Sequence, residues 1–275
     1  VPNLVKQGFK GDIHCTAATS DLTNIMLLDS AHIQESDARF VSKVRRRHDQ
    51  PPVEPLYGAR DVPPALDLLE SHRYNRWFAV DDGIQAIFRN AGHILGSAVT
   101  VLKLDDGGES LRLCFTGDLG RKNLPIVRDP YVVDDADVLI IESTYGDRLH
   151  GNIDDAQDKL ARVINQTVAR GGKVIVPSFA LERTQDLIYG LHKLKLAQQI
   201  PDIPVYVDSP LAIDATDIFR LHPECFDDEV NEFMRTVEDP FGFRRLHYVR
   251  TTDESIMLNM MHGPMMIISA SGMAE

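Results

Sequence analysis

The sequence predicts an α/β protein of roughly two domains, because its length suits two domains and the predicted order of helices and strands differs between two parts of the chain. Strands joined by short Gly-containing turns fill the first part, whereas helices and buried strands alternate from Ile153 onward. The first pattern is typical of hairpins, and the second is typical of a parallel, doubly wound sheet. The 275 residues, of which 43% are hydrophobic, are enough to form a core without disulfide or metal staples.

The first part begins with a predicted strand and a long helix. The strand is Asp12–Cys15, and the helix spans Ser20–Arg47, where apolar side chains recur at helical spacing. Asp61 is expected to cap a short helix that has Pro63 and Pro64 in its first turn. Two hairpins follow, the first pairing Trp77–Val80 with Ile84–Phe88 and the second pairing Ala98–Leu104 with Leu111–Phe115.

The second part alternates between helices and strands. A Ser209-Pro210 pair predicts the start of one helix, with serine as its cap and proline at its first position. The other predicted elements are helix Ile153–Arg170, strand Lys173–Val176, helix Phe179–Leu196, strand Val205–Val207 and strand Pro264–Ile268.

Composition excludes several classes of protein. No apolar run is long enough to span a membrane, and three cysteines without a CxxC pair indicate a reduced, cytoplasmic chain. The formal net charge of −12 excludes a protein whose surface is basic throughout and binds nucleic acid in that way. A nucleic acid must therefore be held by local positive groups or by metal ions.

Polar side chains follow three apolar strands in the first part, each in or beside a Gly-containing turn. They are His93 in AIFRNAGH, Asp118 in LRLCFTGD and Glu142 in VLIIESTYGD. Because ligands gather where strands end, an imidazole and two carboxylates there indicate a metal hydrolase. The imidazole favours zinc over magnesium or manganese, which prefer oxygen ligands.

Each of these residues also has a structural interpretation that the pattern leaves open. His93 can be an ordinary hydrogen-bonded histidine, Asp118 a turn former and Glu142 a cap of the following turn. The spacing lacks an HxH partner and is not specific by itself.

Six ordered segments resemble a known family. They are AGHILGSA, FTGDLGR, IIESTYGDR, VIVPSFALERTQDLIYGL, VYVDSPLA and IISASGM. In this order they resemble the metallo-β-lactamase-fold ribonucleases of the β-CASP group. This group includes the endonuclease subunit of the pre-mRNA 3′-end cleavage machinery and the related bacterial and archaeal RNA-processing enzymes. The resemblance implies a partial metallo-β-lactamase αββα sandwich over residues 1–148. It also implies an inserted Rossmann-like parallel α/β domain, the β-CASP domain, over residues 149–275.

The resemblance also implies roles for individual residues. His93 matches a terminal zinc ligand, and Asp118 matches the carboxylate that bridges two zinc ions. Glu142 matches the acidic residue of the first β-CASP motif, which supports a histidine not found in this chain. The implied reaction is hydrolysis of RNA phosphodiester bonds, endo- or exonucleolytic, by a hydroxide that bridges the two zinc ions.

Three further residues are candidates for binding the RNA substrate. Ser178 is expected to cap the helix after VIVPSF, whose N-terminus suits a phosphate, and Arg183 is expected on that helix. Ser271 is expected at a strand-to-helix turn that cradles phosphate. For Arg183 the rival interpretation is ordinary helix surface. The expected partners are RNA and a homodimer or RNA-processing complex, and no membrane.

The sequence departs from the family in one respect. None of its ten histidines forms the HxHxDH motif that supplies most zinc ligands in the family. We expect this chain to be an internal stretch of a longer protein, and to hold metal poorly and not catalyse by itself. Two alternatives stay open: an inactive RNA-processing scaffold subunit of the same family and a small-molecule zinc hydrolase. His14, His72 and His262 are interpreted as structural or surface residues.

Overall fold

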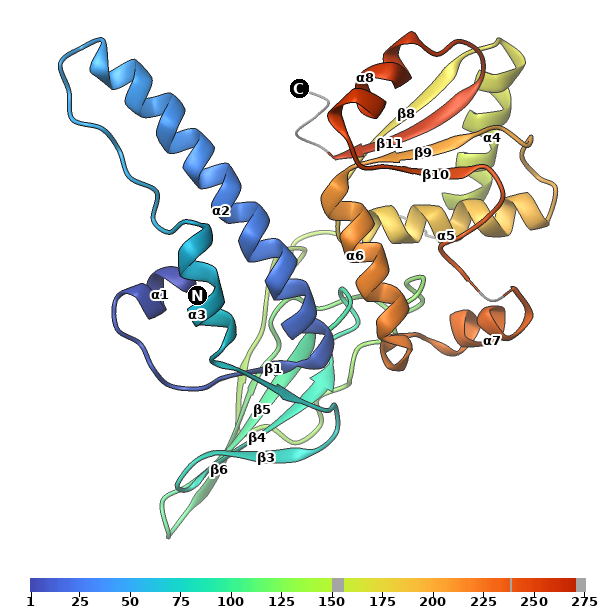
Figure 1. Cartoon of the computed structure of the whole chain (residues 1–275). Helices are drawn as coiled ribbons and strands as arrows, with labels where there is room; N and C mark the ends of the chain where they lie inside the picture. Colours follow the sequence, from blue (N-terminus) through green and yellow to red (C-terminus); the bar gives the residue numbers. More distant parts are fainter. Residues whose placement is uncertain (150–155, 238, 271–275) are drawn as a thin grey trace. The chain divides into compact units, whose positions relative to one another are not determined.

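The computed structural model describes residues 1–149, 156–237 and 239–270, which form two compact units (Figure 1). One unit comprises Val1–Asn90, Gly96–Phe115 and Val132–Leu139. The other comprises Ala91–Leu95, Thr116–Tyr131 and the chain from Ile140 onward. The chain therefore passes between the units several times. The division of the family domains near residue 148 stays a prediction.

A five-stranded sheet with strand order β3-β4-β5-β6-β7 lies in the first unit (Figure 1). Its strands are β3 (Trp77–Asp81), β4 (Ile84–Asn90), β5 (Ala98–Asp105), β6 (Ser110–Phe115) and β7 (Val138–Ile140). The β3–β4 and β5–β6 pairs are antiparallel, which confirms both predicted hairpins. Gly83 has φ +70 in the first turn, a conformation that glycine adopts without strain.

Helices and a small parallel sheet complete the first unit. The helices are α1 (Pro2–Lys6), α2 (Ala17–Arg46), the 3-10 turn η1 (Ala59–Asp61) and α3 (Val62–Leu66). The Thr16 hydroxyl caps α2 by accepting a bond from the Thr19 N–H at 3.2 Å, so the long helix starts slightly earlier than predicted. Strand β1 (Ile13–Thr16) corresponds to the first predicted strand and pairs in parallel with β2 (Leu69–His72). Strand β2 was not predicted from the sequence.

The second unit contains a four-stranded parallel sheet with strand order β10-β9-β11-β8 (Figure 1). The strands are β8 (Lys173–Ser178), β9 (Val205–Asp208), β10 (Leu246–Val249) and β11 (Met265–Ala270). The all-parallel pairing confirms the architecture predicted from helix–strand alternation. Strand β10 was missed, because its four residues lack a distinctive pattern.

Helices connect these parallel strands. They are α4 (Ala156–Ala169), α5 (Arg183–Leu196), α6 (Pro210–Leu221), η2 (Pro223–Cys225), α7 (Asp228–Val237) and α8 (Thr252–Met260). The Ser209 hydroxyl accepts the Ala212 N–H at 3.2 Å, which confirms the predicted cap of α6. The predicted helix Phe179–Leu196 is wrong at its start. Residues 180–182 form a turn that ends at Glu182 with φ 67, and α5 begins at Arg183.

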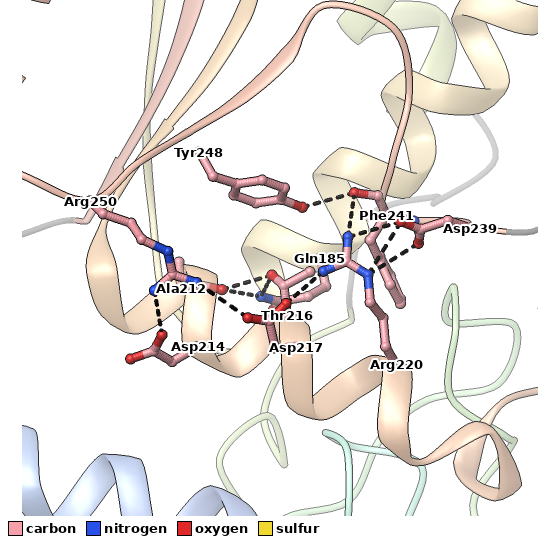
Figure 2. Close-up of polar contacts among 10 residues, drawn as sticks. All are labelled: Gln185, Ala212, Asp214, Thr216, Asp217, Arg220, Asp239, Phe241, Tyr248 and Arg250. Atoms are coloured by element: carbon pink, nitrogen blue, oxygen red, sulfur yellow. Dashed lines mark hydrogen bonds and ion pairs between the residues drawn. The ribbon is translucent and has the colours of Figure 1, made fainter. Parts of the chain in front are cut away.

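A buried polar network joins α5 to α6 (Figure 2). Gln185, which is fully buried, donates through its side-chain amide to the carbonyls of Ala180 and Ala212 and to the Thr216 hydroxyl. Nearby, Arg220 forms a bidentate ion pair with Asp239 and donates to the Phe241 carbonyl, to which the Tyr248 hydroxyl also donates. These bonds connect helices to loops without relying on apolar packing alone.

Across the parts of the chain that the structure describes, none of the helices has both the length and the apolar character to cross a membrane.

Candidate functional site

His93, Asp118 and Glu142 come together at one pocket of the second unit. Each lies in a loop, after β4, β6 and β7 respectively. The Nε2 atom of His93 lies 3.9 Å from Oδ2 of Asp118, and their side chains are 40% and 77% exposed. All three residues line a pocket of about 500 Å³. The structure therefore brings the three sequence candidates into one solvent-accessible place.

Close backbone packing holds the loops of His93 and Asp118 together. The Gly120 N–H donates to the Ala91 carbonyl at 2.9 Å. A Cβ atom on Gly120 would lie 1.5 Å from the carbonyl oxygen of Gly92, so only glycine fits there. Gly92 itself has φ +62, and a Cβ there would lie 2.7 Å from the Arg128 carbonyl oxygen. The glycines that flank His93 and Asp118 thus set the spacing of the two side chains.

Glu142 acts on the loop of Asp118 through hydrogen bonds. One carboxylate oxygen accepts the Leu119 N–H at 2.8 Å and the other accepts the Thr144 N–H at 3.3 Å. The Glu142 N–H donates in turn to the Thr116 hydroxyl at 3.3 Å. Hydrogen bonds from Thr144 and from the Leu119 backbone lower the pKa of Glu142, so this side chain stays a carboxylate. The geometry gives Glu142 a positioning role for the Asp118 turn.

Glu182 supports the loop of His93, although no sequence motif marked it as a candidate. Its carboxylate is buried and accepts the Leu95 N–H at 2.9 Å. Burial, and next the neighbouring Asp186, raise the pKa of Glu182 well above its usual range. The available sequence signal is a glutamate that directly follows two apolar residues in the segment ALERTQ. Nothing in that segment indicates that its hydrogen-bond partner lies 87 positions earlier in the chain.

Two arginines line the same pocket, Arg121 and Arg183. The Arg183 side chain is 63% exposed, and its guanidinium lies 3.6 Å from the Asp186 carboxylate. A planar guanidinium beside an open pocket can pair with a phosphate through two N–H groups. Arg121 was not singled out from the sequence, because one arginine after a Gly-containing turn carries no specific signal.

The two serine candidates have different outcomes. Ser178 ends β8 and is buried, and its hydroxyl accepts a bond from the Thr184 hydroxyl at 3.2 Å. The expectation that Ser178 caps the following helix is wrong, because α5 starts five residues later. A contact between Ser178 and RNA stays a prediction. Ser271 lies outside the described residues.

The donor chemistry of His93 and Asp118 fits part of a zinc shell. One imidazole nitrogen and one carboxylate oxygen are zinc ligands, and their 3.9 Å separation allows both to reach one ion after a small side-chain movement. Within residues 1–149, 156–237 and 239–270, no third ligand atom completes a compact group of three with them. The chemistry and spacing of His93 and Asp118 are thus compatible with two positions of a zinc site.

Comparison with protein families identifies a domain in the second half of the chain. The model of the β-CASP domain matches residues 184–275. The matched segment starts beside Arg183 and includes α6 and the strands β9, β10 and β11.

Curated relatives match almost the entire chain. A ribonuclease of Thermus thermophilus is 31% identical over 273 residues, which cover 99% of this chain and 58% of the relative. An RNase J-like protein of Methanocaldococcus jannaschii is 30% identical over 271 residues, covering 96% of this chain and 56% of the relative. The transcription termination factor FttA of the same organism is 28% identical over 278 residues, which cover 99% of this chain and 41% of that relative. The chain therefore spans between 41% and 58% of the lengths of these three relatives.

Proposed function

The chain belongs to the β-CASP group of metallo-β-lactamase-fold proteins, and from this premise we propose that the complete protein is a zinc-dependent ribonuclease. The observation that carries the proposal is the pocket in which His93 and Asp118 lie beside Arg183. A pair of metal ligands next to an exposed cation suits a phosphodiester, whose negative charge both can attract.

In this proposal, His93 and Asp118 hold zinc together with ligands from the rest of the complete protein. Bound zinc supplies a Lewis acid and a water of lowered pKa. Glu142 keeps the Asp118 turn in place through the Leu119 N–H. Glu182 does the same for the His93 loop through the Leu95 N–H. Fixed ligand loops limit the reorganisation that metal and substrate binding would otherwise require.

Arg183, with Arg121 on the same pocket wall, would bind the RNA backbone. The chain has a net charge of −12, so attraction to RNA must come from such local cations and from the metal. Backbone contacts of this kind favour binding by charge and shape rather than by base sequence. Two further predictions belong to the complete protein: a cytoplasmic location, and assembly as a homodimer or in an RNA-processing complex.

The decisive test substitutes Asp118 in the complete protein. Asp118→Asn removes a negative charge facing the metal, and we expect bound zinc to fall and RNA cleavage to drop by about a hundredfold or more. Thermal stability should change little, because the Asp118 side chain is 77% exposed. Asp82→Asn, the same chemical change in an exposed hairpin turn, is the matched control. Unchanged zinc content and cleavage in Asp118→Asn would remove this residue from the metal site.

A second experiment separates the ribonuclease from its two rivals. Single-stranded RNA should bind the complete protein with an affinity that falls as salt is added. Arg183→Ala should weaken binding by about 1–2 kcal/mol. Arg235→Ala should not, although Arg235 also pairs with a carboxylate three residues away. RNA binding without cleavage in zinc-loaded protein would favour the scaffold subunit. Hydrolysis of a small substrate without RNA binding would favour the small-molecule hydrolase.

A further inference from the structure

Three potential metal ligands lie on one face of the small parallel sheet in the first unit. The register of β1 and β2 pairs His14 with Glu70 and Thr16 with His72. Side chains alternate between the two faces of a strand, and paired residues share a face. The pairing therefore places His14, Glu70 and His72 on the same face. Cys15, between them in register, points to the other face and is buried.

The donor atoms of the three side chains lie at distances that suit one metal ion. Nδ1 of His14 is 2.9 Å from Nε2 of His72. Oε2 of Glu70 is 3.8 Å from the His14 nitrogen and 4.0 Å from the His72 nitrogen. In a tetrahedral zinc site with bonds of ~2.0–2.1 Å, ligand atoms lie ~3.3–3.4 Å apart. The observed separations bracket this value, so small side-chain rotations suffice to bind an ion.

The surroundings of the three side chains orient the His72 ring and leave the group open to solvent. The His72 ring stacks on Phe78 with centroids 3.6 Å apart and an interplanar angle of 6°, which fixes its orientation. Glu70 is 54% exposed, which leaves the group open to ions from solvent.

We propose that His14, Glu70 and His72 form a binding site for a zinc-type divalent transition metal, with water completing the coordination. Two imidazole nitrogens select such a metal over magnesium or calcium, which prefer oxygen ligands. The ion would link β1 to β2 and so tie residues 13–16, which lead into α2, to residues 69–72. The site uses none of the residues proposed for RNA hydrolysis, so the two proposals stand independently.

The test measures metal binding by the untagged 275-residue chain with Co²⁺, whose visible absorption reports its coordination. The double variant His93→Gln with Asp118→Asn removes the two ligands of the other candidate site. We expect this variant to bind one Co²⁺ with a tetrahedral-type spectrum, and Zn²⁺ to displace it. Adding Glu70→Gln or His14→Gln should weaken binding by about tenfold or more, since even an indirect partner of a metal contributes that much.

Controls separate a metal site from general effects of substitution. Glu70 is about half exposed, so Glu70→Gln should keep the far-UV circular dichroism spectrum and the metal-free melting temperature. His32→Gln, at an exposed histidine of α2, should leave Co²⁺ affinity unchanged. Zinc should raise the melting temperature of the double variant by more than that of its Glu70→Gln form at the same zinc concentration. Equal Co²⁺ affinity with and without Glu70 and His14, or no Co²⁺ binding by the double variant, would overturn the proposal.

Discussion

The carboxylate of Glu182 accepts a hydrogen bond from the backbone N–H of Leu95 at 2.9 Å, although the two residues are 87 positions apart. This bond joins the turn that precedes α5 to the loop that carries His93. The other carboxylate oxygen of Glu182 is buried and has no hydrogen-bond partner among the residues that the structure describes. Burying the Glu182 carboxylate costs free energy, and the hydrogen bond to the Leu95 N–H offsets part of that cost. This arrangement is expected of a residue that positions a loop.

Replacing Glu182 should loosen the His93 loop. Glu182→Ala leaves the Leu95 N–H without its partner, so we expect a loss of about 1–3 kcal/mol in the free energy of unfolding. Amide hydrogen exchange at Leu95 should accelerate at the same time. Glu182→Gln keeps an acceptor oxygen in place and should retain most of the protection. If the Leu95 amide exchanges equally slowly in wild type and Glu182→Ala, this bond does not hold the loop.

Asp186 makes the stability of the protein depend on pH. Burial raises the pKa of Asp186 to about 7, against the opposing effect of Arg183. The folded state then holds a proton that the unfolded chain releases near pH ~4, so stability from this group falls as pH rises from ~4 to ~7. Wild type should therefore melt at a lower temperature at pH 8 than at pH 5.

Asp186→Asn removes this titration. The difference in melting temperature between pH 5 and pH 8 should narrow by about 5–10 °C, because the stability that this group loses between pH 5 and its folded pKa of about 7 is about 2–3 kcal/mol. Some dependence should remain, because the pKa of Glu182 is raised in the same direction. Asp12→Asn, at an exposed position, should leave the difference as in wild type. A pH profile of Asp186→Asn that matches wild type would show that Asp186 is ionised throughout this range.

Gly120 should tolerate no side chain. Gly120→Ala places a Cβ 1.5 Å from the Gly92 carbonyl oxygen, and the atoms that it would meet belong to the backbone of Gly92 and His93, so no side-chain rotation can make room. We expect a loss of about 1–3 kcal/mol in unfolding free energy, measured in urea, together with weaker zinc binding by the complete protein. Gly108→Ala is the matched control, since its added Cβ would meet only the Asp106 carboxylate at 3.7 Å. Equal stability of the two variants would contradict the packing described here.

Gln185 should be important for stability rather than for binding RNA. Its amide nitrogen shares its two hydrogens among the Ala180 carbonyl, the Ala212 carbonyl and the Thr216 hydroxyl, and the residue is fully buried. Figure 2 shows the contacts with Ala212 and Thr216. Gln185→Ala removes these bonds and leaves a cavity, so we expect a loss of about 2–3 kcal/mol in urea unfolding. Gln199→Ala, at an exposed glutamine, should cost much less. A small effect of Gln185→Ala would mean that Thr216 and the Ala212 carbonyl satisfy each other without it.

Some elements could be predicted from the sequence because the signal and the structure involve the same few residues. Ser209 and Pro210 start α6 as expected, since a serine hydroxyl reaches an N–H only three residues ahead. The turn at Gly83 closes the first hairpin for a similarly local reason. The start of α5 was wrong because tertiary packing holds Glu182 at φ 67, against its local preference.

The sequence by itself determined the helix–strand alternation of the second unit, the two hairpins and the candidacy of His93, Asp118 and Glu142. The tertiary structure decided which distant segments meet. It placed Glu182 against Leu95, brought Arg183 to the pocket of His93 and Asp118, and paired β1 with β2 so that His14 faces His72. Periodicity and turn chemistry act over a few residues, whereas these contacts require loop closure between segments tens of residues apart. Their formation depends on how the complete core packs, and no short stretch of sequence encodes that.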